Sequence, residues 1–329
     1  MKVAVTGGTG CLGRPLVEKL IKNGAYLKLL TLPNDSPKNF SGNQVKIIIG
    51  DLNSSEALDR LCMECNIIFH LAGEAHSVPK TKEDEVRFIR VNVEGTRNLL
   101  EAAKKNRVKR VVFYSTVSVY GKDSHFQGDE LSPCQPNSVY SESKYLAEEL
   151  VLNSLDNGGP EGVVLRFPVV YGPLDRGNVA KLIKSVRGRY FFYFGDGNSL
   201  RSMISSINAA EAAIKAASEP KAANDLFCVT DKKNYKLSEL IEVICIALKT
   251  NWRPLHLPLS IAIMAGKFGD LIENILKISS PINTAKVNKL SGPLTFSCDK
   301  ASRILKYNPV ETLEEGIRKE VEWMYPQVK

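Results

Sequence analysis

The stretch Lys2-Val-Ala-Val-Thr-Gly-Gly-Thr-Gly-Cys-Leu-Gly13 decides the fold. A short apolar run leads into Gly7, Gly10 and Gly13, and a segment with helical spacing follows. In this context the glycines allow a tight turn and a close approach of the backbone to a pyrophosphate, and the helix start offers it free N–H groups. A glycine turn without a ligand is the alternative. The position directly after the first strand favours a dinucleotide-binding loop.

The alternation of apolar runs and amphipathic segments continues through the first half of the chain. We expect helices over 15–22 and 91–106 and strands over 3–6, 27–31, 46–49, 67–71, 110–115, 163–167 and 226–229. Parallel neighbours need crossover helices, and strands that are apolar throughout are buried on both faces. The predicted class is therefore α/β: a Rossmann-type, doubly wound parallel sheet of about seven strands with a smaller mixed C-terminal lobe.

The regular alternation ends after residue 173, which predicts the domain organisation. Residues 1–173 are expected to form a dinucleotide-binding domain, to which a sheet strand within 208–231 returns. Residues 174–207 and 232–329 are expected to form a substrate-binding lobe.

Composition and charge exclude several classes of protein. Of the 329 residues, 43% are hydrophobic and 24% are charged, which excludes a disordered tail, a collagen-like repeat and a disulfide scaffold. The longest apolar segment, 255–265, is too short to span a bilayer and is expected to be buried or interfacial.

The net charge of +8 favours anionic partners. Phosphates on a small molecule explain it as well as a polynucleotide does, and the basic run 104–110 is typical of a solvated face, so we expect no nucleic-acid partner.

The cysteines and the N-terminal residues indicate in which cellular compartment the protein is expected. Seven cysteines without regular spacing indicate reduced thiols and a cytoplasmic location. Cys62 and Cys65 form a C-x-x-C, but no second pair follows, so we expect ordinary packing and no metal site. The chain begins directly with a strand, so no cleavable leader is expected.

The second and third strands bear on the adenosine half of a dinucleotide. An acid is expected at the end of the second strand, where it would bind the ribose hydroxyls. Thr31 stands there instead, Asp35 is near, and no arginine follows to bind a 2′-phosphate. Asp51 and Leu52, just after the third strand, are candidates for contact with the adenine. The choice between NAD and NADP stays open.

A tyrosine, a lysine and a hydroxyl form the candidate catalytic group. Tyr140 and Lys144 lie one helical turn apart on one face, and Ser115 and Thr116 end the fifth strand, at the sheet edge where ligands bind. A free phenol is a poor base at neutral pH, whereas a nearby ammonium and a positive nicotinamide would lower its pKa. Tyr140 is thus the candidate acid/base. Lys144 would tune it and hold the nicotinamide ribose, and Thr116 would bind the same substrate oxygen.

With these residues the chain resembles, over nearly its whole length, an extended short-chain dehydrogenase/reductase of the NAD-dependent epimerase/dehydratase family. Further family motifs appear as His70-Leu-Ala-Gly73, Val91-Asn92-Val-Glu-Gly95 and Leu165-Arg-Phe-Pro-Val-Val-Tyr-Gly-Pro173. Within the family it is most similar to UDP-galactose 4-epimerase and related UDP-sugar 4-reductases. The resemblance implies a homodimer and a cofactor site with NAD or NADP.

The resemblance also implies individual site residues. Asn92 would line the cofactor, and a helix N-cap is its alternative role. The implied cofactor contacts are Gly7, Gly10, Cys11, Leu12, Gly13, Thr31, Asp51, Leu52, Leu71, Ala72, Gly73, Asn92, Ser115, Tyr140, Lys144, Phe167 and Val169.

The second lobe contains the residues implied to bind substrate. Asn178 and the Val179 backbone would approach a nucleotide diphosphate, and Arg201 would pair with it bidentately. Phe194 would stack on uracil. The alternative is that Phe194 packs in the core of this lobe and that Arg201 is an ordinary surface residue. Val169 departs from the family pattern, because relatives that bind sugar nucleotides usually carry an asparagine there.

Three functions follow from this sequence. The first is an NAD(P)-dependent enzyme acting at C4 of a UDP-hexose, as a 4-epimerase or as a reductase of 4-keto-6-deoxy sugars, with the UDP-sugar as its partner. The second is a dehydrogenase or reductase of a hydroxysteroid or flavonoid-like alcohol, which Val169 and the apolar segment 257–265 would suit. The third is a scaffold that senses the cofactor without catalysis, which the complete catalytic set disfavours.

Overall fold

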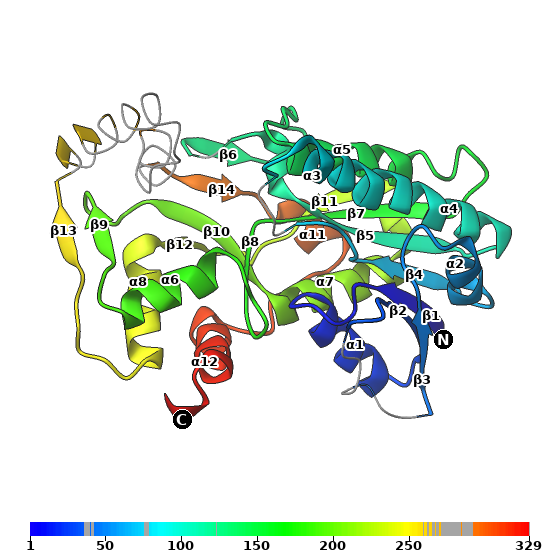
Figure 1. The fold of residues 1–329 in the computed structure, drawn as a ribbon, viewed down its shortest axis with the longest axis horizontal. Coiled ribbons are helices and arrows are strands. Elements are labelled where there is room, and N and C mark those ends of the chain that lie inside the picture. Colours follow the sequence, from blue (N-terminus) through cyan, green and yellow to red (C-terminus); the bar gives the residue numbers. More distant parts are fainter. Residues whose placement is uncertain are drawn as a thin grey trace.

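The computed structural model describes most of the chain (Figure 1). The described residues are 1–35, 40, 43–75, 79–122, 124–258, 260–261, 263–264, 267, 270, 284 and 292–328, with the backbone alone at residue 194. Part of the apolar segment 255–265 therefore lies outside the described residues.

A seven-stranded parallel sheet forms the larger part of the molecule, in the order β11-β7-β5-β4-β1-β2-β3. Its strands are β1 (Lys2–Thr6), β2 (Tyr26–Thr31), β3 (Val45–Ile49), β4 (Ile67–His70), β5 (Arg110–Thr116), β7 (Glu161–Phe167) and β11 (Asp225–Cys228). These are the seven strands expected from the sequence, and the predicted fold class is confirmed. The strand order reverses between β1 and β4, which creates a crevice at the carboxyl ends of these strands.

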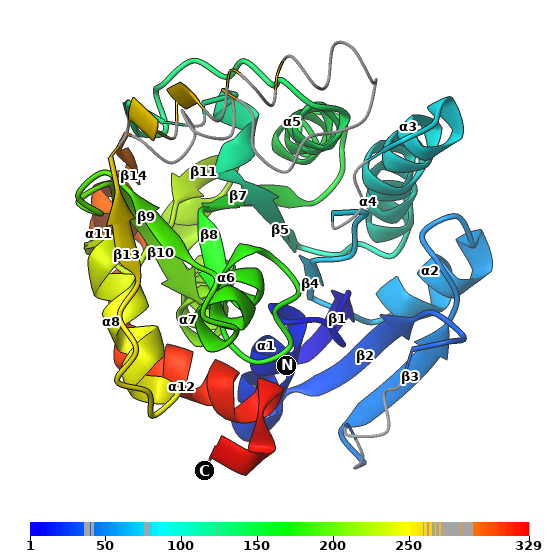
Figure 2. The ribbon, with the colours of Figure 1, turned by 60° about the vertical axis from the view of Figure 1, so that its left-hand side comes forward.

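Helices cover both faces of this sheet (Figure 2). On one face, α1 (Gly13–Lys22), α7 (Ser206–Ser218) and α11 (Asp299–Ile304) contribute to one core. On the other, α2 (Ser55–Cys62), α4 (Gly95–Lys105) and α5 (Val139–Leu152) form a second core. Burial of the central strands between two helical layers explains their largely apolar sequences, whereas the edge strand β3 is mostly not buried.

The helical stretch before β5 differs from the expected single helix over 91–106. It begins at α3 (Lys82–Phe88), where Thr81 and Asp84 form a capping box, and it runs through a π-helical segment, Ile89–Glu94, into α4. Asn92 lies inside the π-helical segment, so its alternative role as a helix N-cap is wrong. π-helical turns often occur at functional sites.

The second lobe has its own sheets and core. One sheet has the order β12-β10-β14-β6, with β8 paired to β10, and β9 pairs with β13 in a separate two-stranded ribbon. The strands are β6 (Phe126–Gly128), β8 (Val169–Tyr171), β9 (Phe192–Phe194), β10 (Leu200–Ser205), β12 (Asn234–Lys236), β13 (Leu255–Leu257) and β14 (Leu294–Phe296). A third core is packed from α6 (Asn178–Arg187), α8 (Leu237–Ala247) and α12 (Leu313–Met324). Short helical turns lie at Val117–Tyr120, Pro220–Ala222 and Pro326–Val328.

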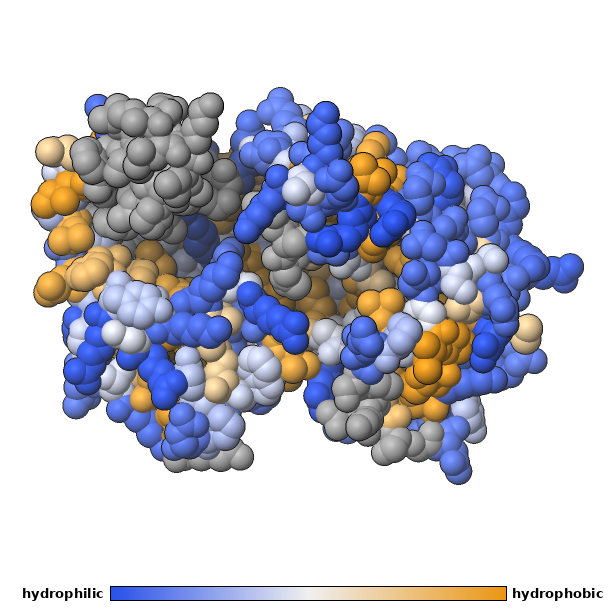
Figure 3. Space-filling view, viewed as in Figure 1, coloured by the Kyte–Doolittle hydropathy of each residue, from blue (hydrophilic) through white to orange (hydrophobic). Residues whose placement is uncertain are grey.

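The surface is mainly hydrophilic in the view of Figure 3, with one group of hydrophobic side chains at the left-hand end, along β13, and another at the lower right. Within the part of the chain that the structure describes, none of the helices combines the length and the apolar character needed to span a bilayer.

The C-x-x-C pair has the packing role expected for it. Cys62 and Cys65 are buried in the core on the α2 face of the sheet, and the Cys65 thiol donates to the Leu61 carbonyl at 3.2 Å. Burial raises the pKa of both thiols.

Candidate active site

The glycine loop packs tightly against the end of β4. Gly7 has a positive φ of 72°, and a Cβ there would lie 2.6 Å from the Ala72 amide nitrogen. A Cβ at Gly13 would lie 2.1 Å from the Gly7 carbonyl oxygen. Any side chain at these two positions would push the loop, the helix and β4 apart.

The residues around this loop fit a bound dinucleotide. At Gly10, no described atom would lie closer than 3.9 Å to an added Cβ, so the loop has an open side. The start of α1 has neither a capping side chain nor an acid in its first turn among the described residues. Thr31 Oγ1 and Ser115 Oγ are buried without a hydrogen-bond partner in the described part of the chain. Open N–H groups and orphaned hydroxyls at the carboxyl edge of the sheet suit a pyrophosphate with its two riboses.

Asp35, in the segment after β2, contacts the glycine loop at Thr9, whereas the end of β2 carries Thr31. Its carboxylate accepts hydrogen bonds from the Leu32 amide and the Thr9 hydroxyl, each at 3.3 Å. Asp51 is exposed and accepts a hydrogen bond from the Asn53 amide at 2.9 Å, within its own turn. The geometry therefore favours Asp35, which the sequence left undecided, as the candidate ribose-binding acid.

A buried network anchored by His70 supports the crevice. Thr6 Oγ1 accepts the Ala72 amide at 3.1 Å and lies 2.8 Å from His70 Nδ1, while His70 Nε2 lies 3.0 Å from Thr96 Oγ1. The Thr96 hydroxyl donates its one proton to the Asn92 carbonyl at 2.6 Å. It follows that Nε2 carries the imidazole proton and that Nδ1 accepts from Thr6. Burial lowers the pKa of His70 to about 3, helped by the charge of Lys144, so the imidazole is neutral.

Asn92 joins this network to the helix that carries the catalytic pair. Its amide donates to Ser143 Oγ at 2.9 Å and to the Glu74 carbonyl at 3.0 Å, and its Oδ1 accepts the Glu74 amide at 2.7 Å. Ser143, the residue before Lys144, was not singled out from the sequence. Its partner lies 51 positions away, so no local pattern could indicate the contact.

The three candidate catalytic residues meet at the carboxyl end of β5. Ser138 caps α5, Tyr140 is half-buried in its first turn, and Lys144 follows one turn later. The Thr116 hydroxyl donates to Ser118 Oγ at 3.1 Å, and it is close enough to the Tyr140 phenol to act on the pKa of that phenol. Thr116 and Tyr140 are therefore placed to hold one substrate oxygen between them.

The ammonium group of Lys144 has other contacts than those expected from the sequence. Its ammonium donates to the Tyr114 carbonyl at 2.6 Å and lies 3.8 Å from the centre of the Phe113 ring. Burial lowers the pKa of Lys144 to about 7, against the opposing charge of Glu148. Burial also raises the pKa of Tyr140, and the nearby Thr116 hydroxyl partly offsets this rise. This direction is opposite to the one expected, because desolvation of the phenol dominates and the ammonium is bonded to the Tyr114 carbonyl.

A buried ion pair fixes the helix that carries these residues. Glu148 lies one turn after Lys144, and its carboxylate accepts from Arg166 Nη2 at 2.6 Å and Nε at 3.0 Å. Both side chains are buried, and Arg166 also donates to the Tyr120 hydroxyl at 2.9 Å. Removal of either partner would leave an uncompensated charge in the core, so this pair holds α5 against β7.

The start of α6 differs from the simple anion site expected from the sequence. Asn178 is exposed at the first position of the helix, whereas the Val179 side chain is buried in the core of the second lobe. The Asp175 carboxylate accepts the Gly177 amide at 2.7 Å and the Ala180 amide at 3.0 Å. An acid that the sequence analysis missed thus occupies part of this helix start, and a diphosphate would have to bind beside it.

Arg201 is half-buried on β10, the strand that pairs with β8. Its guanidinium donates to the Leu200 carbonyl at 3.1 Å and to the Gly292 carbonyl. Val169 is half-buried on β8 and pairs with Met203. Phe194 lies in β9, and its side chain is outside the described residues.

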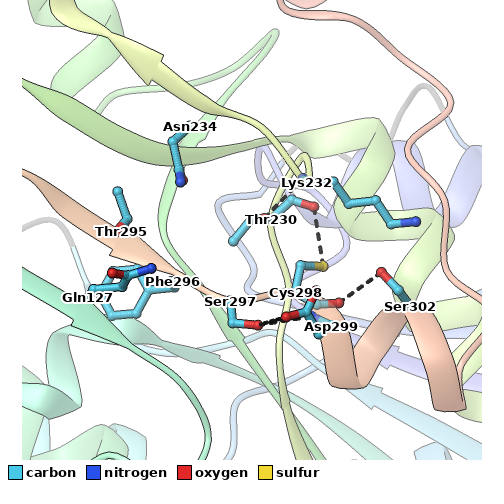
Figure 4. Close-up of a pocket in the computed structure, with 10 residues that line it drawn as sticks. All are labelled: Gln127, Thr230, Lys232, Asn234, Thr295, Phe296, Ser297, Cys298, Asp299 and Ser302. Carbon is cyan, nitrogen blue, oxygen red and sulfur yellow. Dashed lines mark hydrogen bonds between the residues drawn. The ribbon is translucent and has the colours of Figure 1, made fainter. Parts of the chain in front are cut away.

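A polar hollow of about 470 Å³ lies elsewhere in the second lobe (Figure 4). None of the predicted site residues lines it. Its polar groups bond one another or their neighbours: Lys232 reaches Asn308 at 2.6 Å, and Ser297 donates to Asp299 at 2.9 Å. The hollow is therefore separate from the predicted site.

The comparison with protein families agrees with this geometry. The model of the NAD dependent epimerase/dehydratase family matches residues 3–229, which is more than half of the chain. The chain belongs to this family. It is accordingly an enzyme of the extended short-chain dehydrogenase/reductase type, and the cofactor of the family is NAD.

Individual relatives differ in what they act on. The chain is 28% identical to N-acetyl-alpha-D-glucosaminyl-diphospho-ditrans,octacis-undecaprenol 4-epimerase of Escherichia coli O157:H7, over 85% of this chain and 84% of that protein. It is also 28% identical to the decarboxylating sterol-4-alpha-carboxylate 3-dehydrogenase of Candida albicans, over 98% of this chain and 97% of that protein. The solved UDP-glucuronic acid 4-epimerase of Bacillus cereus in complex with NAD has a TM-score of 0.78, 22% identity and full coverage of both chains. At that identity the structural likeness establishes the fold.

The position of Asp35 leads to a prediction about the cofactor. We expect Asp35→Ala to weaken NAD binding by about tenfold, because the ribose would lose a hydrogen bond to a carboxylate. The wild-type protein should prefer NAD over NADP, since the carboxylate repels a 2′-phosphate, and Asp35→Asn should remove most of that preference. Titration calorimetry with each cofactor measures both effects. Equal affinities of the wild-type protein for NAD and NADP would rule out this role for Asp35.

Proposed function

We propose that the protein is an NAD-dependent enzyme that acts at C4 of a hexose carried on UDP. The placement of Tyr140 in the first turn of α5, near Thr116 at the carboxyl end of β5, together with the open glycine loop at the end of β1 in the same sheet, carries this proposal. Residues 174–207 and 232–329 would form the lobe that holds the UDP group, with Arg201 and the start of α6 nearest to its phosphates. A homodimer and a cytoplasmic location stay predictions.

The residues of the chain divide the chemistry between them. The Tyr140 phenolate would accept the proton of the sugar 4-hydroxyl, while the Thr116 hydroxyl holds the same oxygen. The bound nicotinamide supplies the acceptor for the hydride that leaves C4. Lys144 would keep a positive charge near the phenolate and hold the nicotinamide ribose. In the reverse direction Tyr140 would return its proton to the 4-keto oxygen.

An epimerase and a 4-keto-sugar reductase need the same side chains, so the assay has to separate them. The protein is incubated with UDP-hexoses, and nicotinamide absorbance is followed together with the configuration of the product at C4. An inverted product without lasting reduction of the cofactor supports the epimerase. Stoichiometric consumption of reduced cofactor with a UDP-4-keto sugar supports the reductase. Absence of both reactions over a panel of UDP-sugars would overturn the proposal.

We expect Arg201→Leu to lower kcat/KM for a UDP-sugar by about 10- to 100-fold, since a bidentate contact with the diphosphate would be lost. Arg201→Lys keeps the positive charge but lacks the planar guanidinium that makes two parallel hydrogen bonds. Its kcat/KM should lie between those of the wild-type protein and Arg201→Leu. Circular dichroism checks that both variants fold. Unchanged turnover of every UDP-sugar in Arg201→Leu would remove the main support for a nucleotide-sugar substrate.

Two observations favour a hydrophobic alcohol, such as a sterol, as a second candidate substrate. Asp175 places a carboxylate at the start of α6, and Val169 is apolar where an amide would bind a diphosphate. The sterol dehydrogenase relative matches nearly the whole chain. Oxidation of a 3-hydroxysteroid that needs Tyr140 but is insensitive to Arg201→Leu would favour this candidate over the first.

A further inference from the structure

The far end of the second lobe exposes hydrophobic side chains. The exposed fractions are 41% for Phe192, 66% for Leu255, 51% for Ile261 and 71% for Met264. We name these four residues the apolar tip. The sequence left open whether this segment is buried or interfacial, and these exposures exclude burial for Leu255, Ile261 and Met264.

The four side chains belong to one part of the surface. Phe192 in β9 and Leu255 in β13 are register partners, so they share one face of the ribbon. Ile261 and Met264 follow β13 along the chain, and the Ile261 amide donates to the Pro258 carbonyl at 3.0 Å. Figure 3 shows the hydrophobic side chains together at this end of the molecule. Scattered exposed apolar residues are ordinary, but a cluster marks a contact surface.

The other face of the ribbon anchors the tip. The Tyr193 ring is buried in the core of the second lobe and stacks on His256, with 4.4 Å between the ring centres. His256 Nδ1 lies 3.0 Å from the Gly195 carbonyl oxygen. Alternation along the strands therefore directs Tyr193 inward and leaves Phe192 and Leu255 outward, on a ribbon held by its inner face.

Cationic side chains flank the tip in the chain. Arg189 precedes β9, Arg253 precedes β13, and Lys267 follows Met264, and all three are exposed. The whole chain carries a net charge of +8. Apolar and aromatic side chains bordered by arginine and lysine are the composition of segments that lie at the surface of anionic membranes.

We propose that the apolar tip inserts into the outer layer of a bilayer that contains anionic phospholipid, with Arg189, Arg253 and Lys267 near the headgroups. Insertion would remove the exposed apolar side chains from water, and the lipid phosphates would neutralise the flanking cations. The second lobe would then face the membrane while the seven-stranded sheet stays away from it. This inference does not depend on which alcohol the enzyme uses.

Vesicle sedimentation with the full chain tests the proposal. The wild-type protein should sediment with vesicles of equimolar phosphatidylcholine and phosphatidylglycerol, and bind vesicles of phosphatidylcholine alone about tenfold more weakly, since three cations lose their partners. Leu255→Gln/Met264→Gln should weaken binding to the anionic vesicles by at least about tenfold, because two large apolar side chains no longer leave water. Tyr26→Gln/Met63→Gln is the matched control, because both residues are exposed hydrophobics outside the second lobe, at 58% and 52%.

Three outcomes would overturn the proposal. One is that the wild-type protein binds neither vesicle, and another is that the tip variant and the control variant bind equally. The third is a wild-type dimer in sedimentation equilibrium that Leu255→Gln/Met264→Gln converts to monomer without vesicle binding by either protein, which would make the tip a contact between two copies. Circular dichroism of each variant shows that a loss of binding is not a loss of fold.

Discussion

Replacement of Tyr140 by phenylalanine is expected to reduce turnover by about 10²- to 10⁴-fold, the contribution usual for a positioned general acid or base. The ring of Tyr140 packs edge-on against Phe88, with 6.3 Å between the ring centres, and phenylalanine preserves that contact. The variant should therefore fold and bind NAD like the wild-type protein. Only the proton transfer at the substrate oxygen should be lost.

Tyr145→Phe is the matched control for this variant. Tyr145 lies on the same helix and packs, partly exposed, against the cluster that contains Tyr120 and Phe296. Turnover, NAD affinity and thermal unfolding are measured for both variants. If Tyr140→Phe keeps turnover close to that of Tyr145→Phe, the phenol is not the acid or base.

The second large effect concerns Lys144 and combines activity with stability. Lys144→Met should reduce turnover strongly, because the proposed hydrogen bond from Lys144 to the nicotinamide ribose would be lost. It should also change how stability depends on pH. Burial lowers the pKa of Lys144 to about 7 in the folded protein, whereas the unfolded chain keeps an ordinary lysine pKa.

Between these two pKa values the unfolded state binds more protons than the folded state, so the free energy of unfolding rises with pH in that window. From pH 7 to pH 9 the wild-type protein should gain about 2 kcal/mol relative to Lys144→Met. Urea unfolding at the two pH values measures this difference. The exposed Lys105, replaced by Met, is the control and should follow the wild-type protein. A wild-type stability that changes with pH in parallel with Lys144→Met would show that the lysine is not desolvated.

Local patterns were sufficient to predict the sheet and the place of Tyr140 and Lys144 on one helix. The strand–glycine–helix run at Gly7–Gly13 and the spacing of Tyr140 and Lys144 are properties of short segments, and the structure keeps both. The central strands were predicted because burial on both faces makes them largely apolar, and the edge strand β3 is apolar enough to be recognised although it is mostly not buried.

Contacts between distant segments could not be predicted in this way. His70 bonds Thr6 and Thr96, and Glu320 in α12 reaches across 148 positions to accept the Gly172 amide at 2.8 Å. Burial raises the pKa of Glu320 to about 8, which no sequence pattern around it would suggest. Asp35 was undervalued for a different reason, because it lies in a loop beyond the strand end where the search for an acid stops.

The central claim is that Tyr140 exchanges a proton with a C4 oxygen while hydrogen leaves C4 for the cofactor. The most direct measurement is rapid mixing of the NAD-loaded protein with a UDP-hexose that carries either hydrogen or deuterium at C4, followed by nicotinamide absorbance. We predict a transient reduction that is slower with the deuterated sugar and absent in Tyr140→Phe. Reduction of equal size in Tyr140→Phe, or no reduction with any UDP-hexose in the wild-type protein, would contradict the account.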